Sequence, residues 1–427
     1  MSTPSDSSSS ALRSYQIRTF VLTWLSYAGF YLTRKPVSVV KARLQDEQGI
    51  STATLGLMDT GYLTAYAIGQ FVSGMLGDRL GARKLLALGM LGTALCSVAF
   101  GMSGSGMLLV LFWCLNGFFQ SSGWPGNIKA MTPWFGSTSR GKVMGVWSTC
   151  YQVGGIVGTA LAAWLLAQYG WRSPFFVPAV LVAGVGLLIF FFLVQHPRDV
   201  GLQGEGVSPS DSTSSTPPSP VEQEAPLGVL ETLKLPGILN LGAAYFCLKL
   251  IRYTLLFWLP YYLSKVLLYP EDTAGYLSTS FEVGGVVGAI VVGYLSDKYF
   301  AGRRVTVAAP LVFCIGGAML IYLQVGTWGM WFNAGAMALV GFLLFGPDSL
   351  LSGAAAQDLG GARAAGSAAG VINGMGSVGA ILQGQVTSVV AEQYGWNTLF
   401  YVLVGLSTAG ALALLPLFLR ERARAKA

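Results

Sequence analysis

Twelve long apolar runs are the feature that most constrains what this chain can fold into. A helix needs about 20 mostly apolar residues to cross the hydrocarbon core of a bilayer. The runs lie near residues 17–41, 56–78, 84–103, 106–128, 142–168, 171–195, 237–264, 272–296, 305–325, 329–352, 364–390 and 396–419. Hydrophobic residues make up 53% of the chain and charged residues 11%, a more apolar balance than a soluble core of this size requires. The sequence therefore predicts an all-α integral membrane protein with twelve transmembrane helices.

The lysines and arginines predict how these helices are oriented. Cations that flank short loops stay on the cytoplasmic side of a membrane. If the N-terminus is cytoplasmic, the external minority consists of Lys41, Arg43, Arg172 and Lys265. The net charge of +7 then reflects topology, because the cations are dispersed among loops and form no aromatic and basic patch for nucleic acid. We expect a multi-pass protein with both termini in the cytoplasm, and the compact loops favour a bacterial inner membrane.

A segment rich in serine, proline and acidic residues, at 203–224, is typical of a flexible linker. On either side the sequence repeats at an offset near 219 residues: "GMLGDRLGARK" returns as "GYLSDKYFAGRR", and "GWRSPFFV" as "GWNTLFYV". We predict a tail at 1–16, a six-helix half at 17–196, a cytoplasmic linker at 197–235, a second half at 236–420 and a tail at 421–427. Two such halves imply a pseudo-two-fold axis along the membrane normal, with a binding site between the halves.

A G-x-L-x-D-[RK] motif follows the second and eighth spans and resembles the loop signature of the major facilitator superfamily. It contains Asp78 and Arg79 in the first half, and Asp297 and Lys298 in the second. Carboxylates at cytoplasmic helix ends can pair with cations of neighbouring helices, which makes a gate that breaks when this side opens. The alternative is ordinary loop chemistry, and under neither interpretation are these residues substrate ligands.

Four cations lie inside predicted helices and away from their ends: Arg34, Lys35, Lys249 and Arg252. A cation at the centre of a transmembrane helix costs about 2.5–3.5 kcal/mol on insertion scales, so these side chains must face the protein interior, a water-filled cavity or the interface. Lys249 and Arg252 are one turn apart and share a helix face. Arg252 is also the repeat counterpart of Arg34.

The intramembrane carboxylates do not obviously cancel these cations. Glu282 is the preferred fixed partner, because Asp59 lies near the outer end of its helix and Asp348 follows a Gly-Pro break. The surplus positive charge favours an anionic substrate, and a phosphate group fits because the guanidinium fork matches its oxygens bidentately. A purely structural set of interhelix salt bridges is the alternative.

Polar and aromatic side chains inside the helices supply further candidate ligands. Tyrosine and tryptophan combine a hydrogen-bonding tip with an apolar body, which suits the hydroxyls and carbon faces of a sugar, although packing is the commoner role. The candidates are Tyr27, Tyr31, Tyr66, Gln70, Trp124, Tyr151 and Asn373. The sequence contains no Cys/His metal spacing, no ATP-binding glycine loop and no catalytic constellation. We therefore expect no enzyme activity, metal or cofactor, and transport driven by a gradient.

Several stretches together resemble one transporter family: "YLTRKPVSVVKARL", "LNGFFQSSGWPGNIKAMTPWF", "HPRDVGL", "IRYTLLFWLPYYL", "GFLLFGPDSLLSGAAAQDLG" and "GSAAGVINGMGSVGA". They resemble the organophosphate:phosphate antiporters of the major facilitator superfamily. The resemblance implies that Arg34 and Arg252 bind phosphate, since that family places one arginine in helix one and one in helix seven. The chain departs from the family's glycerol phosphate antiporter at Tyr151, Gln70 and Lys249, where that protein has histidine, lysine and tyrosine.

The sequence thus predicts a monomeric secondary antiporter in a lipid bilayer, which exchanges an organophosphate for inorganic phosphate by alternating access. The organophosphate is expected to be a sugar phosphate such as a hexose phosphate, or glycerol phosphate. Two alternatives remain open: a transporter-like membrane sensor of sugar phosphate, and a proton-coupled organic anion symporter in which Glu282 titrates.

Overall fold

The computed structural model describes residues 4–136, 143–202, 229–300 and 303–424. These residues form helices and no strand, as the predicted all-α fold requires. Before the linker the α-helices are α1 (Pro4–Arg34), α2 (Pro36–Gln48), α3 (Thr52–Met102), α4 (Gly106–Gln120), α5 (Gly123–Met131), α7 (Thr149–Tyr169) and α8 (Ser173–Phe192), followed by the 3-10 turn η1 (Pro197–Val200). After it come α9 (Val229–Leu233), α10 (Ile238–Lys265), α11 (Glu271–Tyr299), α12 (Arg304–Val325), α13 (Met330–Ser349), the π-helical η3 (Leu350–Ala354), α14 (Ala355–Tyr394) and α15 (Trp396–Arg424).

The predicted spans overlap these helices, although residue 142, at the start of the span 142–168, lies outside the described residues. In three places the division into helices differs from the prediction. The spans 56–78 and 84–103 both lie in α3, which turns at Gly81. Gly81 has φ 77° and ψ 163°, a conformation that strains any residue with a side chain. The span 17–41 is divided between α1 and α2 at Lys35, because a proline disfavours helical geometry in the residue before it. The span 106–128 is divided between α4 and α5.

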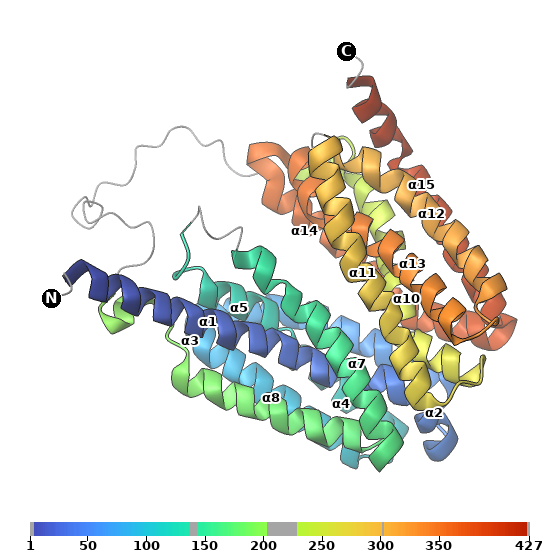
Figure 1. The fold of residues 1–427 in the computed structure, drawn as a ribbon, viewed down its shortest axis with the longest axis horizontal. Coiled ribbons are helices and arrows are strands. Elements are labelled where there is room, and N and C mark those ends of the chain that lie inside the picture. Colours follow the sequence, from blue (N-terminus) through green and yellow to red (C-terminus); the bar gives the residue numbers. More distant parts are fainter. Residues whose placement is uncertain (1–3, 137–142, 203–228, 301–302, 425–427) are drawn as a thin grey trace. The chain divides into compact units, whose positions relative to one another are not determined.

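Packing divides the chain into two units, and each is a helical bundle (Figure 1). Unit 1 comprises residues 1–36 and 64–223, and within it α1 packs against α7, α8 and α5. Unit 2 comprises residues 37–63 and 224–427, and within it α10 packs against α14 and α15. The repeat-related helices α1 and α10 therefore each pack against the last two long helices of their own unit, as expected for an internal repeat. Residues 37–63, which lie in the predicted first half, pack with unit 2.

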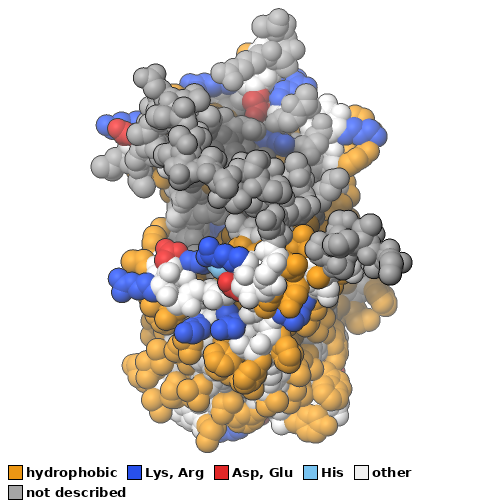
Figure 2. Space-filling model, turned by 90° about the vertical axis from the view of Figure 1, so that its left-hand side faces the viewer, with side chains coloured by type: hydrophobic (Ala, Val, Ile, Leu, Met, Phe, Trp, Pro, Cys, Tyr) orange, Lys and Arg blue, Asp and Glu red, His pale blue; other side chains and the backbone are white. Residues whose placement is uncertain are grey.

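The outer surface of the helices is apolar. Eight described helices are long and apolar enough to cross a membrane. Large hydrophobic side chains are exposed on them, for example Phe71 at 78%, Leu95 at 71% and Phe191 at 69%. Figure 2 shows Lys and Arg side chains gathered in a band on one face, with hydrophobic side chains covering the surface below them. This distribution is that of an integral multi-pass membrane protein, whose apolar surface faces lipid.

Candidate substrate-binding site

Arg34 is the last residue of α1 and is buried in unit 1, with 7% of its surface exposed. Its Nε donates a hydrogen bond to Oε1 of Gln120, over 2.9 Å. Its guanidinium lies 4.5 Å from the ring centre of Tyr31 and 5.0 Å from that of Tyr66. Gln120 in turn donates to Asn116 Oδ1 over 2.7 Å. A neutral amide network and two aromatic rings therefore fix the direction of this cation.

Lys35, next in the chain, is also buried, with 2% exposed. Its backbone N–H still bonds to the carbonyl of Tyr31, at 3.1 Å, although Pro36 ends the helix here. Its stem packs over α7 at Gly158, where an added Cβ would lie 3.3 Å from Lys35 Cγ and 2.9 Å from the Tyr31 carbonyl oxygen. The structure therefore places Lys35 inside the bundle and not in a snorkelling position at the interface.

Arg252 on α10 occupies the corresponding position in unit 2. Its Nη1 donates to Oδ2 of Asp348 over 2.7 Å, and the two side chains are 16% and 12% exposed. Its guanidinium also lies 4.2 Å from the ring centre of Phe345. The sequence prediction preferred Glu282 to Asp348 as the fixed partner of the intramembrane cations, and so it missed the Arg252–Asp348 ion pair. Glu282 lies on α11 and is 9% exposed.

The break that argued against Asp348 is what places it in the site. Asp348 follows Gly346-Pro347 near the end of α13, directly before the π-helical turn η3. Single π-helical turns widen a helix locally and are frequent at functional sites. The Gly-Pro stretch therefore precedes the carboxylate that pairs with Arg252, although the sequence prediction took this break as an argument against Asp348.

Lys249 lies one turn before Arg252, on the helix face that the sequence predicts. Its Nζ is 5.3 Å from the ring centre of Tyr245 and 5.5 Å from that of Tyr253. Gly376 of α14 lets the helices approach, because a Cβ there would be 2.5 Å from the Tyr245 ring and 3.0 Å from Lys249 Cγ. Lys249 and Arg252 thus place two cations on one face of α10 within unit 2.

The aromatic candidates of unit 1 lie beside Arg34. The ring centres of Tyr27 and Trp124 are 5.8 Å apart, those of Tyr27 and Tyr31 5.9 Å, and those of Tyr31 and Tyr151 6.4 Å. These rings and Tyr66 make up the aromatic group of unit 1, in which Tyr31 and Tyr66 contact the guanidinium of Arg34. Trp124 is 41% exposed, so its ring is not fully buried.

Two other predicted ligands have different surroundings. Gln70 is exposed on α3. Asn373 donates its amide to the backbone carbonyls of Ala369, at 2.9 Å, and Ser352, at 3.3 Å. The second bond connects α14 to the π-helical turn η3, which begins two residues after Asp348. Asn373 therefore helps to hold the backbone next to this carboxylate in place.

The predicted gating residues form local contacts. Asp78 accepts a hydrogen bond from Lys129 over 2.6 Å, both side chains being exposed, as expected for a carboxylate paired with a neighbouring helix. Lys298 donates to the hydroxyl of Tyr294 over 2.8 Å. Arg79 is exposed, and the side chain of Asp297 lies outside the described residues.

A buried ion pair that the sequence did not predict lies in unit 2. Lys41 Nζ donates to Oδ2 of Asp59 over 2.6 Å, and both side chains are at most 2% exposed. The Lys41 ammonium also lies 3.8 Å from the ring centre of Trp258. The prediction counted Lys41 among the external cations and missed the pair, because nothing in the sequence shows which helices cover this lysine. Arg43, two residues after Lys41 on α2, donates a hydrogen bond to Glu271. This bond and the negative charge of Glu271 raise the pKa of the Arg43 guanidinium.

The chain matches the Major Facilitator Superfamily over residues 19–384. The protein belongs to this superfamily. Its relatives include the glucose-6-phosphate exchanger SLC37A2 of Bos taurus, which is 32% identical over 95% of this chain and 94% of that protein. Sugar phosphate exchanger 3 of Homo sapiens is 31% identical, over 95% of this chain and 93% of that protein. A protein of Arabidopsis thaliana provisionally named glycerol-3-phosphate transporter 1 is 33% identical, over 95% of this chain and 88% of that protein.

These relatives confirm the resemblance to the organophosphate:phosphate antiporter family that the motifs indicate. The superfamily fold also agrees with a solved structure. A bacterial homologue of the human lysosomal transporter Spinster, in an inward-facing and unoccupied conformation, has a TM-score of 0.67, with 17% identity and 96% of both chains covered. At this identity the likeness concerns the fold alone. Among the described residues no group of three or more His, Cys, Asp or Glu side chains could hold a metal ion.

Proposed function

We propose that this major facilitator superfamily protein is a secondary antiporter, which exchanges an organophosphate for inorganic phosphate by alternating access. The observation that carries the proposal is an arginine, at most one-sixth exposed, on each of two repeat-related helices, Arg34 on α1 and Arg252 on α10. Burying a guanidinium in a membrane-spanning bundle is costly, so such residues mark substrate or ion pathways. The names of the relatives, which refer to phosphate esters, support the same class of substrate.

A phosphate group suits this pair of cations. Each guanidinium can donate two parallel hydrogen bonds to phosphate oxygens. A phosphomonoester carries about −1.5 to −2 charges at neutral pH, so two arginines neutralise it. Lys249, on the same face of α10 as Arg252, adds a third cation and favours the more highly charged form of the ligand.

The rest of the substrate is assigned to the aromatic group of unit 1. Tyr27, Tyr31, Tyr66, Trp124 and Tyr151 offer apolar ring faces and hydroxyl or indole tips next to Arg34. Such surfaces bind the carbon skeleton and hydroxyls of a small polyol or sugar. We therefore assign the organophosphate to the sugar phosphates or glycerol phosphate.

The charges at Arg252 and Asp348 offer a reason why transport of the organophosphate is coupled to transport of inorganic phosphate in the opposite direction. In the structure, Asp348 holds Arg252 through an ion pair. A bound phosphate replaces this carboxylate as the acceptor and neutralises the cations, so the loaded protein changes conformation more readily than the empty one. Each return step then requires another phosphorylated anion, which is an exchange. We also propose a monomer with cytoplasmic termini, the orientation in which Lys41, Arg43, Arg172 and Lys265 are the external minority of the cations.

Reconstitution in proteoliposomes tests the function. Vesicles are loaded with labelled inorganic phosphate, and efflux is followed after glycerol 3-phosphate or a hexose phosphate is added outside. Exchange predicts efflux only when an external phosphorylated anion is present. Binding without flux would identify a sensor, and flux that follows the pH gradient, and that is lost in Glu282→Gln, would identify a proton-coupled symporter. Arg420→Gln, at an exposed position on α15, is the matched control.

A further inference from the structure

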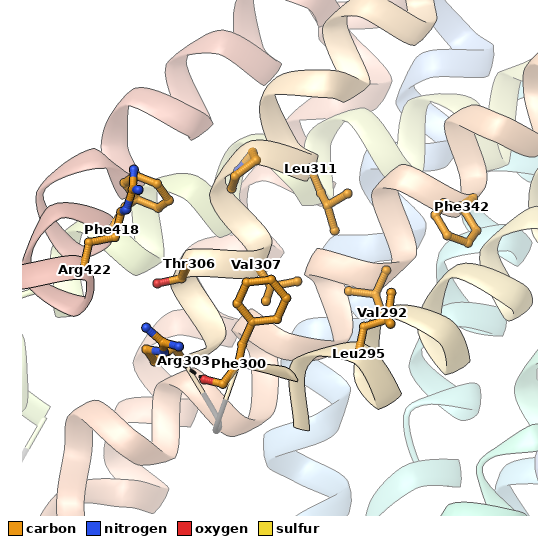
Figure 3. Close-up of a pocket in the computed structure, with 11 residues that line it drawn as sticks. Val292, Leu295, Phe300, Arg303, Thr306, Val307, Leu311, Phe342, Phe418 and Arg422 are labelled. Carbon is orange, nitrogen blue, oxygen red and sulfur yellow. Dashed lines mark hydrogen bonds between the residues drawn. The ribbon is translucent and has the colours of Figure 1, made fainter. Parts of the chain in front are cut away.

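A pocket with a volume of about 700 Å³ lies entirely within unit 2 (Figure 3). Its apolar wall comes from α11, α12 and α13, through side chains such as Leu295, Leu311 and Phe342. Phe418 of α15 and Phe300, at the end of α11, continue this wall. The volume is that of a site for a molecule of ligand size. None of these residues belongs to the phosphate site proposed above.

Two arginines line the same pocket. Arg303 directly precedes α12 and donates its Nε to the carbonyl of Phe300 over 3.0 Å, which leaves the other four N–H groups of the fork to a ligand. Arg422 lies on α15, its guanidinium 5.5 Å from the ring centre of Phe418. Figure 3 shows both arginines on the same side of the pocket, away from Val292 and Phe342. The pocket is therefore amphipathic, cationic at one side and apolar along the rest.

The carboxylate nearest in the sequence to these cations is already hydrogen bonded. Glu421 accepts the backbone N–H of Thr306 over 2.7 Å, the Thr306 hydroxyl over 2.7 Å and the N–H of Val305 over 3.3 Å. It thereby caps the start of α12, where the helix dipole favours a negative charge. An anionic ligand is accordingly the natural partner for the two guanidiniums.

Two of the helices that line the pocket, α11 and α12, also expose apolar side chains. Ile290 of α11 is 67% exposed, Tyr294 56%, and Phe313 of α12 61%. Apolar residues exposed on spanning helices face hydrocarbon. A ligand that enters from this side must itself be membrane-soluble, and an acyl chain matches the apolar wall. Basic pockets between transmembrane helices bind the headgroups of anionic lipids.

A second pocket, within unit 1, supplies an internal comparison. Its volume is about 390 Å³, and its lining includes Ser73, Leu76 and Phe118. The repeat offset relates Ser73 and Leu76 to Val292 and Leu295 of the larger pocket. None of the described residues that line it is charged. The repeat-related pocket of unit 1 thus has an apolar wall but no counterpart of the two arginines.

We propose that unit 2 binds an anionic phospholipid in the pocket between α11, α12, α13 and α15. The lipid phosphate is held by Arg303 and Arg422, and one acyl chain lies against Leu295, Leu311 and Phe342. The site is separate from substrate transport, so the proposal stands or fails independently of the proposed function.

Lipid binding to the purified full-length protein tests this proposal. Wild type and the Arg303→Gln/Arg422→Gln double variant are titrated with labelled phosphatidylglycerol in phosphatidylcholine nanodiscs. We expect wild type to prefer phosphatidylglycerol, and the double variant to lose roughly thirtyfold of this preference, because each basic residue near anionic lipid contributes about fivefold. Arg420→Gln, two residues from Arg422 and outside the pocket, should keep it. Leu311→Trp, which fills the apolar part without changing the charge, should weaken binding as well.

A monodisperse size-exclusion profile and a wild-type temperature of thermal unfolding show that the double variant is folded, whatever the protein transports. An unchanged preference for phosphatidylglycerol in the folded double variant would overturn the proposal. So would equal binding of phosphatidylglycerol and phosphatidylcholine by wild type. Displacement of labelled phosphatidylglycerol by millimolar inorganic phosphate would identify a free-phosphate site and likewise contradict a lipid site.

Discussion

The surroundings of Arg34 and Arg252 differ more than their positions in the repeat suggest. Arg34 is held by the amide oxygen of Gln120 and lies over two tyrosine rings. Arg252 is held by the carboxylate of Asp348 and lies over one phenylalanine ring. The repeat preserves a cation and an aromatic face, while the group that orients the cation differs.

This difference in partner predicts that the two arginines respond differently to a phosphate ligand. An amide oxygen carries no net charge, so it orients the Arg34 guanidinium without competing strongly with a phosphate. A carboxylate is itself an anion, and a phosphate must take its place at Arg252. Under the proposed function, we therefore expect Arg34 to be oriented before phosphate binds, and Arg252 to exchange its carboxylate partner for the substrate.

The largest expected effect is the loss of either guanidinium. Arg34→Gln and Arg252→Gln should each reduce phosphate exchange in proteoliposomes about thirtyfold or more, since removing one partner of a buried charged pair costs about 2–5 kcal/mol. Arg420→Gln, at an exposed position of α15, should retain the wild-type rate. Unaltered exchange in Arg252→Gln would remove the basis for treating the two arginines as one site.

The partners of the arginines should respond in opposite directions. Gln120→Leu removes the group that orients Arg34, so the phosphate concentration for half-maximal exchange should rise about tenfold, the effect of a hydrogen bond to a charged group. Asp348→Asn removes a competing charge from Arg252, so the same concentration should fall severalfold. Concentration series of exchange with each variant measure both effects. A rise in both variants would mean that Asp348, like Gln120, serves only to position its arginine.

The smallest expected effects come from the rings. Tyr66→Leu and Phe345→Leu each remove a ring from an arginine, and a cation–π contact is worth about 0.5–2 kcal/mol. We expect a few-fold loss of apparent affinity for inorganic phosphate in both. With a sugar phosphate, Tyr66→Leu should lose more than Phe345→Leu, because Tyr66 belongs to the aromatic group assigned to the carbon skeleton. Equal losses with both ligands would contradict that assignment.

The fold was largely predictable from the sequence, because the bilayer imposes a strong pattern on every segment that crosses it. The lengths of the apolar runs and the repeat place the helices correctly. The turn inside α3 and the break at Lys35 depend on local backbone geometry at Gly81 and before Pro36. A hydropathy pattern averages over such positions and does not show them.

The site was less predictable, since pairing depends on helix rotation and local distortion. The four intramembrane cations were identified because a charge in an apolar run is conspicuous. The partner of Arg252 was missed, because the π-helical turn after Asp348 was not foreseen. The buried Lys41–Asp59 pair was missed for a related reason, as it requires knowing that Trp258 covers Lys41.

Self-exchange of inorganic phosphate tests the central claim most directly, because it requires no knowledge of the organic substrate. Proteoliposomes loaded with labelled phosphate are diluted into medium that contains phosphate, sulfate or no anion, at equal pH and osmolarity. A protein in which Arg34 and Arg252 together bind a phosphate group should release label rapidly into phosphate medium only. Equally rapid release into anion-free medium would show that movement does not require a second phosphate, and would contradict the account.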